Sequence, residues 1–94
     1  EAPGQMLSHY APSKPLRLNA ITAAPDEYHI GFGPVSGDRN LSPVSDLAEA
    51  ASHLFAALHD ADASGKRRIA VAPVPDEGNG IALNDRLRRA ATPE

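Results

Sequence analysis

The run Ile69-Ala70-Val71-Ala72-Pro73-Val74 constrains the fold more than any other part of this chain. It is short, almost uninterruptedly apolar and contains β-branched residues, which is typical of a parallel strand covered on both faces. Apolar residues recur at helical spacing before it, from Leu47 to Ala61, and after it, from Leu83 to Ala91. A buried strand between two amphipathic helices predicts an α/β fold with a mostly parallel sheet and packed helices, in two or three layers.

Two further strands are predicted nearer the amino terminus. Residues Leu16–Ile21 alternate apolar with polar side chains, and Tyr28–Phe32 forms a second short run that ends among glycines. The second helix is expected from about Asn79 to Ala91, where Thr92-Pro93 ends it. From the second of these strands onward, the order is strand, helix, strand, helix (βαβα) once the central helix is added.

That central helix has two candidate starts. Pro43 suits a first helical position, which predicts a helix from about Pro43 to Ala63. Alternatively, Asp46 and Glu49 have the spacing of a capping box, and the helix begins later. Gly65 is expected to end the helix in either case.

Composition excludes several functions. The 94 residues contain no cysteine, which rules out a disulfide, a thiolate nucleophile and a Cys-based zinc site. No apolar run approaches the ~18 residues of a membrane span, and no signal-peptide pattern occurs, so we expect a soluble, cytoplasmic chain without a membrane partner. The net charge is −3 and basic residues form two short clusters, Lys66-Arg67-Arg68 and Arg86 with Arg88 and Arg89, which disfavours a dedicated nucleic-acid surface.

The glycine loops do not match a nucleotide-binding fingerprint. The loop Pro75–Gly80 lies between the buried strand and a helix, where a phosphate could bind to helix amides, but Leu83 occupies the position of the third glycine. Asp76 and Glu77 also place negative charge where a pyrophosphate would approach. The cluster Gly31–Gly37 fails in the same way and has no helix directly after it. Both loops are expected to be ordinary turns.

The histidines of the predicted domain form no metal-binding or catalytic motif. His53 and His59 are six residues apart on the predicted helix, roughly 120° from a common face, and His29 stands alone in a strand. No nucleophile elbow of the G-x-S-x-G type is present. We therefore assign no catalytic residue and no metal ligand within this chain.

The amino-terminal residues do not read as the start of a domain. Pro12 and Pro15 bias Ala11 and Lys14 away from helical geometry, so the backbone here is expected to be extended. His9-Tyr10 therefore belongs to a stiff segment rather than to a core. Such a segment is typical of a linker and suggests a partner domain upstream.

Three stretches carry a resemblance to a known family. They are the motif Pro3-Gly4 with Ser8-His9-Tyr10-Ala11-Pro12, the stretch Asn40–Pro43 leading into Asp46–Ala51, and Ile69–Pro73 with Gly80 and Asn84–Ala91. In this order they resemble the linker and C-terminal domain of bacterial L-threonylcarbamoyl-AMP synthases. Two positions depart from the family pattern, because Ser45 stands where glycine is usual and Asn79 where leucine is usual. The change from glycine to serine is expected to affect the backbone geometry of the turn before the helix.

The resemblance implies an extended interdomain linker over residues 1–15 and a small Rossmann-like accessory domain over residues 16–94. It implies an upstream YrdC-like catalytic domain that joins ATP, L-threonine and bicarbonate into threonylcarbamoyl-AMP and pyrophosphate, for the threonylcarbamoyladenosine modification of tRNA. ATP is then the cofactor of the complete enzyme, magnesium is left open, and tRNA is an indirect partner. The linker is implied to reach over the active site, where His9 and Tyr10 suit closure around a nucleotide.

Other interpretations stay open. Tyr10 could instead pack on the first strand. Arg86 and Arg89 share a helix face and could dock on the catalytic domain or on tRNA, whereas Asp85 could pair with Arg88 or Arg89 on a merely solvated face. The whole chain could also be a free-standing α/β module that binds a partner or a small ligand. The sequence upstream of Glu1 would separate these possibilities.

Overall fold

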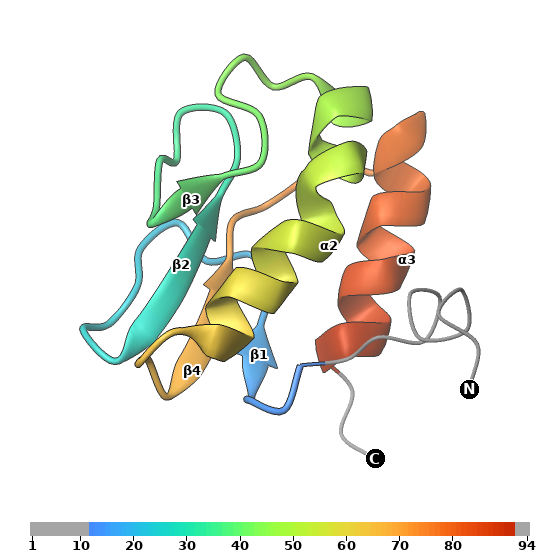
Figure 1. Cartoon of the computed structure of the whole chain (residues 1–94). Helices are drawn as coiled ribbons and strands as arrows, with labels where there is room; N and C mark the ends of the chain where they lie inside the picture. Colours follow the sequence, from blue (N-terminus) through green and yellow to red (C-terminus); the bar gives the residue numbers. More distant parts are fainter. Residues whose placement is uncertain (1–11, 92–94) are drawn as a thin grey trace.

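The structure is a computed structural model that describes residues 12–91 of the chain. Within these residues, four parallel strands form one sheet in the order β1-β4-β2-β3, and two helices follow β3 and β4 (Figure 1). The elements in chain order are β1 (Leu16–Arg17), β2 (Glu27–Gly31), β3 (Arg39–Asn40), α2 (Leu47–Ala63), β4 (Arg68–Val71) and α3 (Asn79–Ala91). The predicted α/β class with a parallel sheet is confirmed.

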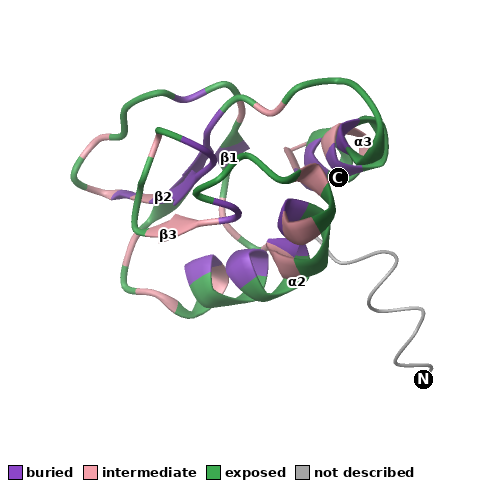
Figure 2. Ribbon diagram, turned by 90° about the horizontal axis from the view of Figure 1, so that it is seen from above, coloured by how far each residue is buried: buried purple, intermediate pink, exposed green. Residues whose placement is uncertain are grey.

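Both helices pack on the same face of the sheet, so the described residues form two layers (Figures 1 and 2). Helix α2 contacts β2, α3 contacts β1, and the two helices contact each other. The core between the two layers contains aliphatic side chains from the sheet and from both helices: Leu16, Ile30, Leu54, Leu58, Ile69, Val71, Leu83 and Leu87. Helical spacing of the apolar residues therefore identified the buried faces of both helices correctly.

The opposite face of the sheet is covered by the loop over residues 18–26 rather than by a helix. The backbone N–H of Ala20 donates to the carbonyl of Val71 at 2.8 Å, and His29 Nε2 lies 2.8 Å from the carbonyl of Ala20. Ala70, whose side chain faces this loop, is fully buried. The central strand is thus covered on both faces, as its apolar run predicted.

The first two strands differ from their predicted limits. The first has two residues instead of six, because Asn19 adopts a left-handed conformation with φ of 58° and turns the chain over the sheet. The second begins at Glu27, one residue earlier than predicted, and ends at Gly31. The apolar residues Leu18 and Ala20 still contribute to packing, which explains the alternation in the sequence.

The short strand β3 was not predicted. It pairs parallel to β2, and residues 32–38 connect the two strands without a helix. The Asp38 carboxylate accepts from the His29 N–H at 2.8 Å, and the Asp38 N–H donates to the His29 carbonyl at 2.7 Å. Gly37 makes this possible, since its φ is +64° and a Cβ there would lie 2.5 Å from the His29 oxygen.

The limits of α2 correct two predictions. The helix begins at Leu47 with Asp46 as its N-cap, so a start at Pro43 is wrong; the Asp46 carboxylate accepts from the N–H groups of Ala48 and Glu49. The Glu49 side chain completes the cap indirectly, because Ser42 Oγ accepts from the Asp46 N–H and donates to Glu49 Oε1.

Gly65 does not end α2 as predicted. The last helical residue is Ala63 and the C-cap is Ser64, whose hydroxyl donates to the Ala61 carbonyl at 2.7 Å. Gly65 does not adopt the left-handed φ of a glycine cap, and no atom lies within 4 Å of the position that a Cβ would take. Neither the backbone conformation nor the packing at this position therefore requires a glycine.

Candidate functional site

Most of the linker residues named from the sequence lie outside the described residues. Pro3, Gly4, Ser8, His9, Tyr10 and Ala11 belong to this group, and their proposed roles stay predictions. Pro12 is the first described residue and is half-buried. Among the described residues, the predicted linker is represented by Pro12 to Pro15, where it joins the domain.

Lys14 attaches this junction to the carboxyl end of α2. Its ammonium donates to the carbonyl of Ala61 at 3.1 Å and to the carbonyl of Ser64 at 2.7 Å. The last carbonyls of a helix lack partners within the helix and carry partial negative charge. The last turn of α2 contains no basic residue of its own, so Lys14 supplies the cation that this helix end lacks.

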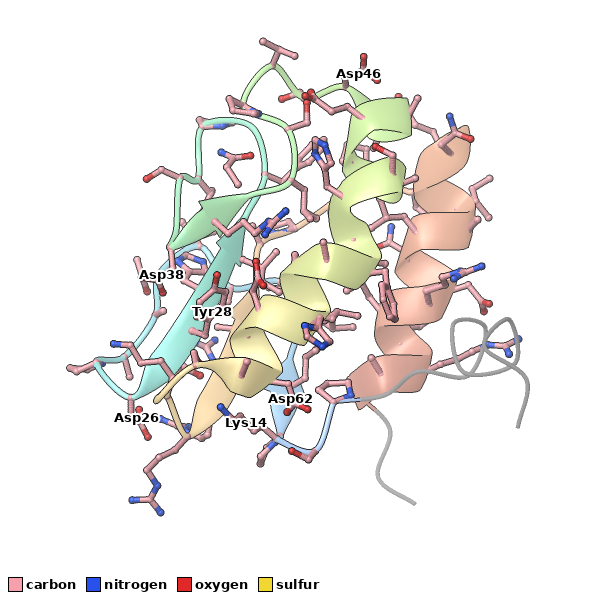
Figure 3. The ribbon with its side chains drawn as sticks, in the orientation of Figure 1. Lys14, Asp26, Tyr28, Asp38, Asp46 and Asp62 are labelled. Atoms are coloured by element: carbon pink, nitrogen blue, oxygen red, sulfur yellow. The ribbon has the colours of Figure 1, made fainter. Side chains whose placement is uncertain are left out.

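Ser13 adds a second attachment to the same helix turn. Its backbone N–H and its hydroxyl donate to Oδ1 of Asp62, at 3.0 and 2.8 Å. Figure 3 shows Lys14 and Asp62 together at the end of α2 opposite to Asp46. We call Ser13, Lys14, Asp62 and the carbonyls of Ala61 and Ser64 the linker anchor.

No local pattern in the sequence indicates the linker anchor, because its hydrogen bonds join residues 47 to 50 positions apart. Strand β4 follows α2 in the chain, and β1 pairs with β4 in the sheet. This pairing brings Ser13 and Lys14, which precede β1, to the end of α2. The predicted boundary between linker and domain at residue 15 stays a prediction.

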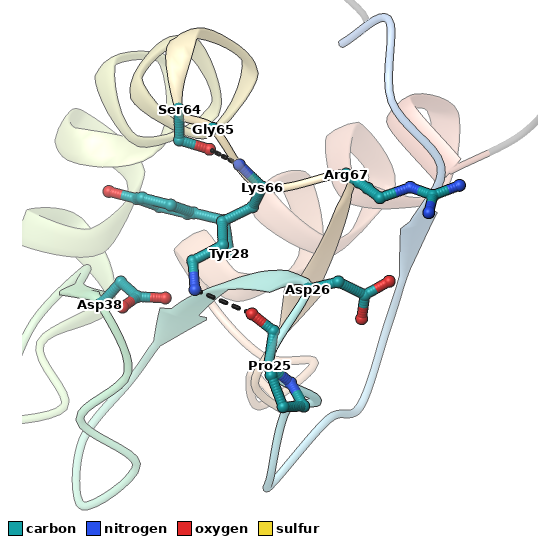
Figure 4. Close-up of a pocket in the computed structure, with 8 residues that line it drawn as sticks. All are labelled: Pro25, Asp26, Tyr28, Asp38, Ser64, Gly65, Lys66 and Arg67. Atoms are coloured by element: carbon teal, nitrogen blue, oxygen red, sulfur yellow. Dashed lines mark hydrogen bonds between the residues drawn. The ribbon is translucent and has the colours of Figure 1, made fainter.

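An open pocket lies at the amino ends of β2 and β4 (Figure 4). The residues that line it are Pro25, Asp26, Tyr28, Asp38, Ser64, Gly65, Lys66 and Arg67. In open parallel sheets, ligands usually bind at the opposite edge, outside the carboxyl ends of the strands. The position of this pocket is therefore not the one that a Rossmann-like nucleotide site would take.

Three charged residues of the pocket, Lys66, Asp26 and Asp38, have hydrogen-bond partners within the protein. Lys66 Nζ donates to the carbonyl of Pro25 at 2.8 Å, Asp26 accepts from Arg68 at 2.7 Å, and Asp38 accepts from the His29 N–H. The guanidinium of Arg67 points away from Tyr28 (Figure 4). Burial, with a smaller contribution from a neighbouring aspartate, raises the pKa of the Tyr28 hydroxyl, so it stays a neutral phenol near pH 7.

Metal sites and membrane spans were also sought among the described residues. Across residues 12–91 no three His, Cys, Asp or Glu side chains are close enough together to hold a metal ion. Across the same residues no helix has the length and apolar content needed to cross a membrane.

The glycine loop before α3 acts as a turn. Gly78 has a φ of +52°, and a Cβ on Gly80 would lie 1.9 Å from the carbonyl oxygen of Pro75. The N–H groups of Gly80 and Ile81 donate to the carbonyls of Glu77 and Gly78, at 2.7 and 3.1 Å. These amides are occupied within the loop, which agrees with the sequence-based interpretation that the loop is no phosphate site.

Arg86 and Arg89 are exposed residues of α3. Arg89 pairs with Asp85 at 3.1 Å, and both side chains are at least half exposed. This is the pair expected for a solvated helix face. A docking role for Arg86 and Arg89 stays a prediction.

An ion-pair network that the sequence analysis missed lies under the loop that covers the sheet. Arg17 donates twice to Glu27, at 2.7 and 3.0 Å, and Arg68 pairs with Asp26. The hydrogen bonds from Arg17 are the main reason why the pKa of Glu27 falls from 4.5 to about 2. This network ties β1 to β2 and has a structural role rather than a catalytic one.

Comparison with known proteins gives the chain its relatives. A family model described as threonylcarbamoyl-AMP synthase, C-terminal domain, matches residues 1–92. No curated protein and no solved structure matches the chain. The match gives the chain a role in a larger transferase of tRNA modification, threonylcarbamoyl-AMP synthase. Because the match includes the predicted linker as well as nearly all of the domain, the chain belongs to the family of threonylcarbamoyl-AMP synthase C-terminal domains.

Proposed function

We propose that this chain is the accessory domain of a cytoplasmic threonylcarbamoyl-AMP synthase and that its linker closes the active site of an upstream YrdC-like catalytic domain. In that enzyme ATP, L-threonine and bicarbonate give threonylcarbamoyl-AMP and pyrophosphate, and the product serves tRNA modification. ATP, and magnesium where the enzyme uses it, bind to the catalytic domain. His9 and Tyr10 contribute to closure.

The observation that carries this proposal is the extent of the family match, which begins at residue 1 and so includes the linker motif with the folded domain. The linker and the domain thus form one unit in the family. The linker anchor supports the same view, because it joins the last linker residues to α2 through side chains as well as through the backbone.

The domain's own chemistry also supports an accessory role. Its sequence has no nucleotide-binding fingerprint, and the amides of its one candidate phosphate loop are occupied by the loop's own carbonyls. Lys66, Asp26 and Asp38 of the pocket are likewise hydrogen-bonded within the protein. Catalytic groups must then come from another domain.

Pyrophosphate release tests the proposal. It should be measured with ATP, L-threonine and bicarbonate for the 94-residue chain, for the complete synthase, and for the synthase without residues 1–12. The chain alone should release none, the complete synthase should turn over, and the linker deletion should lower turnover at least tenfold because the closure residues are lost. Turnover by the chain alone at the rate of the complete enzyme, or full activity after the deletion, would contradict the proposal.

A further inference from the structure

We propose that the pocket at the amino ends of β2 and β4 binds a small zwitterion, an α-amino acid with an apolar side chain. The carboxylate of this ligand binds to Lys66, its ammonium binds to Asp38, and its side chain lies against Tyr28 and Pro25. All four residues line the pocket and belong to the described part of the chain. The site gives the domain a ligand of its own, which the proposed function does not require.

The pocket has the size of a small-molecule site. Its volume is about 590 Å³, within the range of roughly 300–1,000 Å³ that is usual for ligand pockets. Gly65 adds to this space, because no atom lies within 4 Å of the position that a Cβ would take there. The pocket is open to solvent, so it buries only part of a ligand, and we expect affinity in the millimolar range.

Two opposite charges in the pocket keep hydrogen-bonding capacity for a ligand. The ammonium of Lys66 has three N–H groups, and its hydrogen bond within residues 12–91 goes to the carbonyl of Pro25 at 2.8 Å. The Asp38 carboxylate accepts from the His29 N–H through Oδ2, which leaves Oδ1 without a partner among the same residues. Both side chains line the pocket, yet they form no ion pair with each other. One donor group and one acceptor group are therefore available to a ligand.

The remaining charged residues of the pocket do not upset this balance. Both carboxylate oxygens of Asp26 accept from Arg68, at 3.0 and 2.7 Å. The guanidinium of Arg67 points away from Tyr28 (Figure 4). A simple anion in the pocket would meet the carboxylate of Asp38, and a simple cation would meet the ammonium of Lys66. A zwitterion gives each of these charges an opposite partner, which is why the pocket favours it over either ion.

Apolar surface lies beside the two charges. Tyr28 is half-buried, and its ring together with the ring of Pro25 forms part of the pocket wall. The side chain of Lys66 runs past Tyr28 to the carbonyl of Pro25, so its aliphatic stem adds to the same wall (Figure 4). An aliphatic side chain on the ligand removes part of this surface from water. These contacts favour an α-amino acid with an apolar side chain over glycine.

The test is an NMR titration of the ¹⁵N-labelled 94-residue chain with L-leucine at pH 7. The amide resonances of Tyr28, Asp38, Gly65 and Lys66 should shift along one saturable curve with a millimolar Kd. Two analogues each lack one charge: N-acetyl-L-leucine has no ammonium, and L-leucinamide has no carboxylate. Each should bind roughly fivefold more weakly, the largest effect expected for one exposed charge pair.

Substitutions test the same contacts from the side of the protein. Lys66→Met removes the ammonium and keeps the aliphatic stem, whereas Asp38→Asn removes the charge and keeps an oxygen that can accept from the His29 N–H. Each should raise the Kd for L-leucine roughly fivefold. Arg67→Met is the matched control, because it removes a positive charge from the next residue, whose guanidinium points away from Tyr28 (Figure 4). It should bind L-leucine as the wild type does.

Three results would overturn the proposal. The first is the absence of a saturable shift up to the solubility limit of L-leucine, and the second is equal binding of L-leucine and either analogue. The third is a loss of affinity in Arg67→Met as large as that in Lys66→Met, which would show that only the overall charge matters. If Asp38→Asn fails to fold, Lys66→Met and the two analogues decide, since the analogues are tested on the wild-type chain.

Discussion

Glu27 offers the sharpest test of what holds this domain together. Its carboxylate is buried, with 2% of the side chain exposed, and it accepts from Arg17 twice and from the Ala24 N–H at 2.8 Å. The change Glu27→Gln keeps the size of the side chain, removes the charge, and turns an amide N–H₂ toward a guanidinium that can only donate. The substitution therefore removes the bidentate pair that joins the buried Glu27 carboxylate of β2 to the half-exposed Arg17 of β1.

The magnitude follows from the pKa of Glu27, which lies at about 2 instead of 4.5. That difference corresponds to about 3 kcal/mol between the charged and neutral forms. Arg17 is half exposed, however, so water screens part of the attraction and weakens the pair. We therefore expect Glu27→Gln to reduce the free energy of unfolding by about 2 kcal/mol and to lower the Tm by roughly 8–16 °C.

Urea denaturation of the 94-residue chain at pH 7 and pH 3 measures this effect, with Asp85→Asn as the control. Because the pKa of Glu27 is lower in the folded state, its stabilisation is fully present above about pH 4.5 and is lost as the pH falls toward 2. The gap between wild type and Glu27→Gln should thus shrink by roughly half at pH 3. Asp85→Asn should change stability by less than about 0.5 kcal/mol at either pH. Equal stability of Glu27→Gln and wild type at pH 7, or a gap that does not narrow in acid, would refute the reasoning.

Two further substitutions test the turns. Ser45 has a φ of 62°, a left-handed conformation that costs a residue with a side chain roughly 1 kcal/mol. Ser45→Gly should therefore raise the free energy of unfolding, measured by urea denaturation, by about 0.5–1 kcal/mol. A loss of stability would show that the backbone at this turn is not strained. Gly80→Ala should lower the free energy of unfolding by about 1–3 kcal/mol, because its Cβ would lie 1.9 Å from the Pro75 carbonyl oxygen. Gly65→Ala is the control and should be neutral or slightly stabilising, because no atom lies near the position of its Cβ. Equal effects of the two substitutions would show that close packing against Pro75 is not the reason for a glycine at position 80.

The sequence predicted those parts of the fold that depend on local patterns. Helical spacing located α2 and α3, and the continuous apolar run identified β4 as a strand covered on both faces. Two departures from the family pattern were also visible in the sequence. The one at Ser45 has a structural consequence, because this serine occupies the left-handed conformation that a glycine would adopt without strain.

The parts that the sequence did not predict depend on contacts between distant residues. Strand β3 has only the residues Arg39 and Asn40, and it exists because the loop closed by Asp38 lays them beside β2. The loop that replaces a second helical layer is held by Ala20 and His29, whose pairing no periodicity reveals. For the same reason the linker anchor could not be predicted, since Lys14 and the end of α2 are joined only by the tertiary fold.

The central claim is that the linker closes an active site that lies outside this chain, and Tyr10→Phe in the complete synthase tests it most directly. The substitution keeps the ring and removes one hydroxyl. If that hydroxyl donates to a charged phosphate in the closed state, the bond is worth roughly 1.5–3 kcal/mol, so kcat or the affinity for ATP should fall by about ten- to a hundredfold while the Tm stays unchanged. Unchanged kinetics in Tyr10→Phe, together with a lowered Tm in Tyr10→Ala, would contradict the claim and reduce the linker to a tether that packs on its own domain.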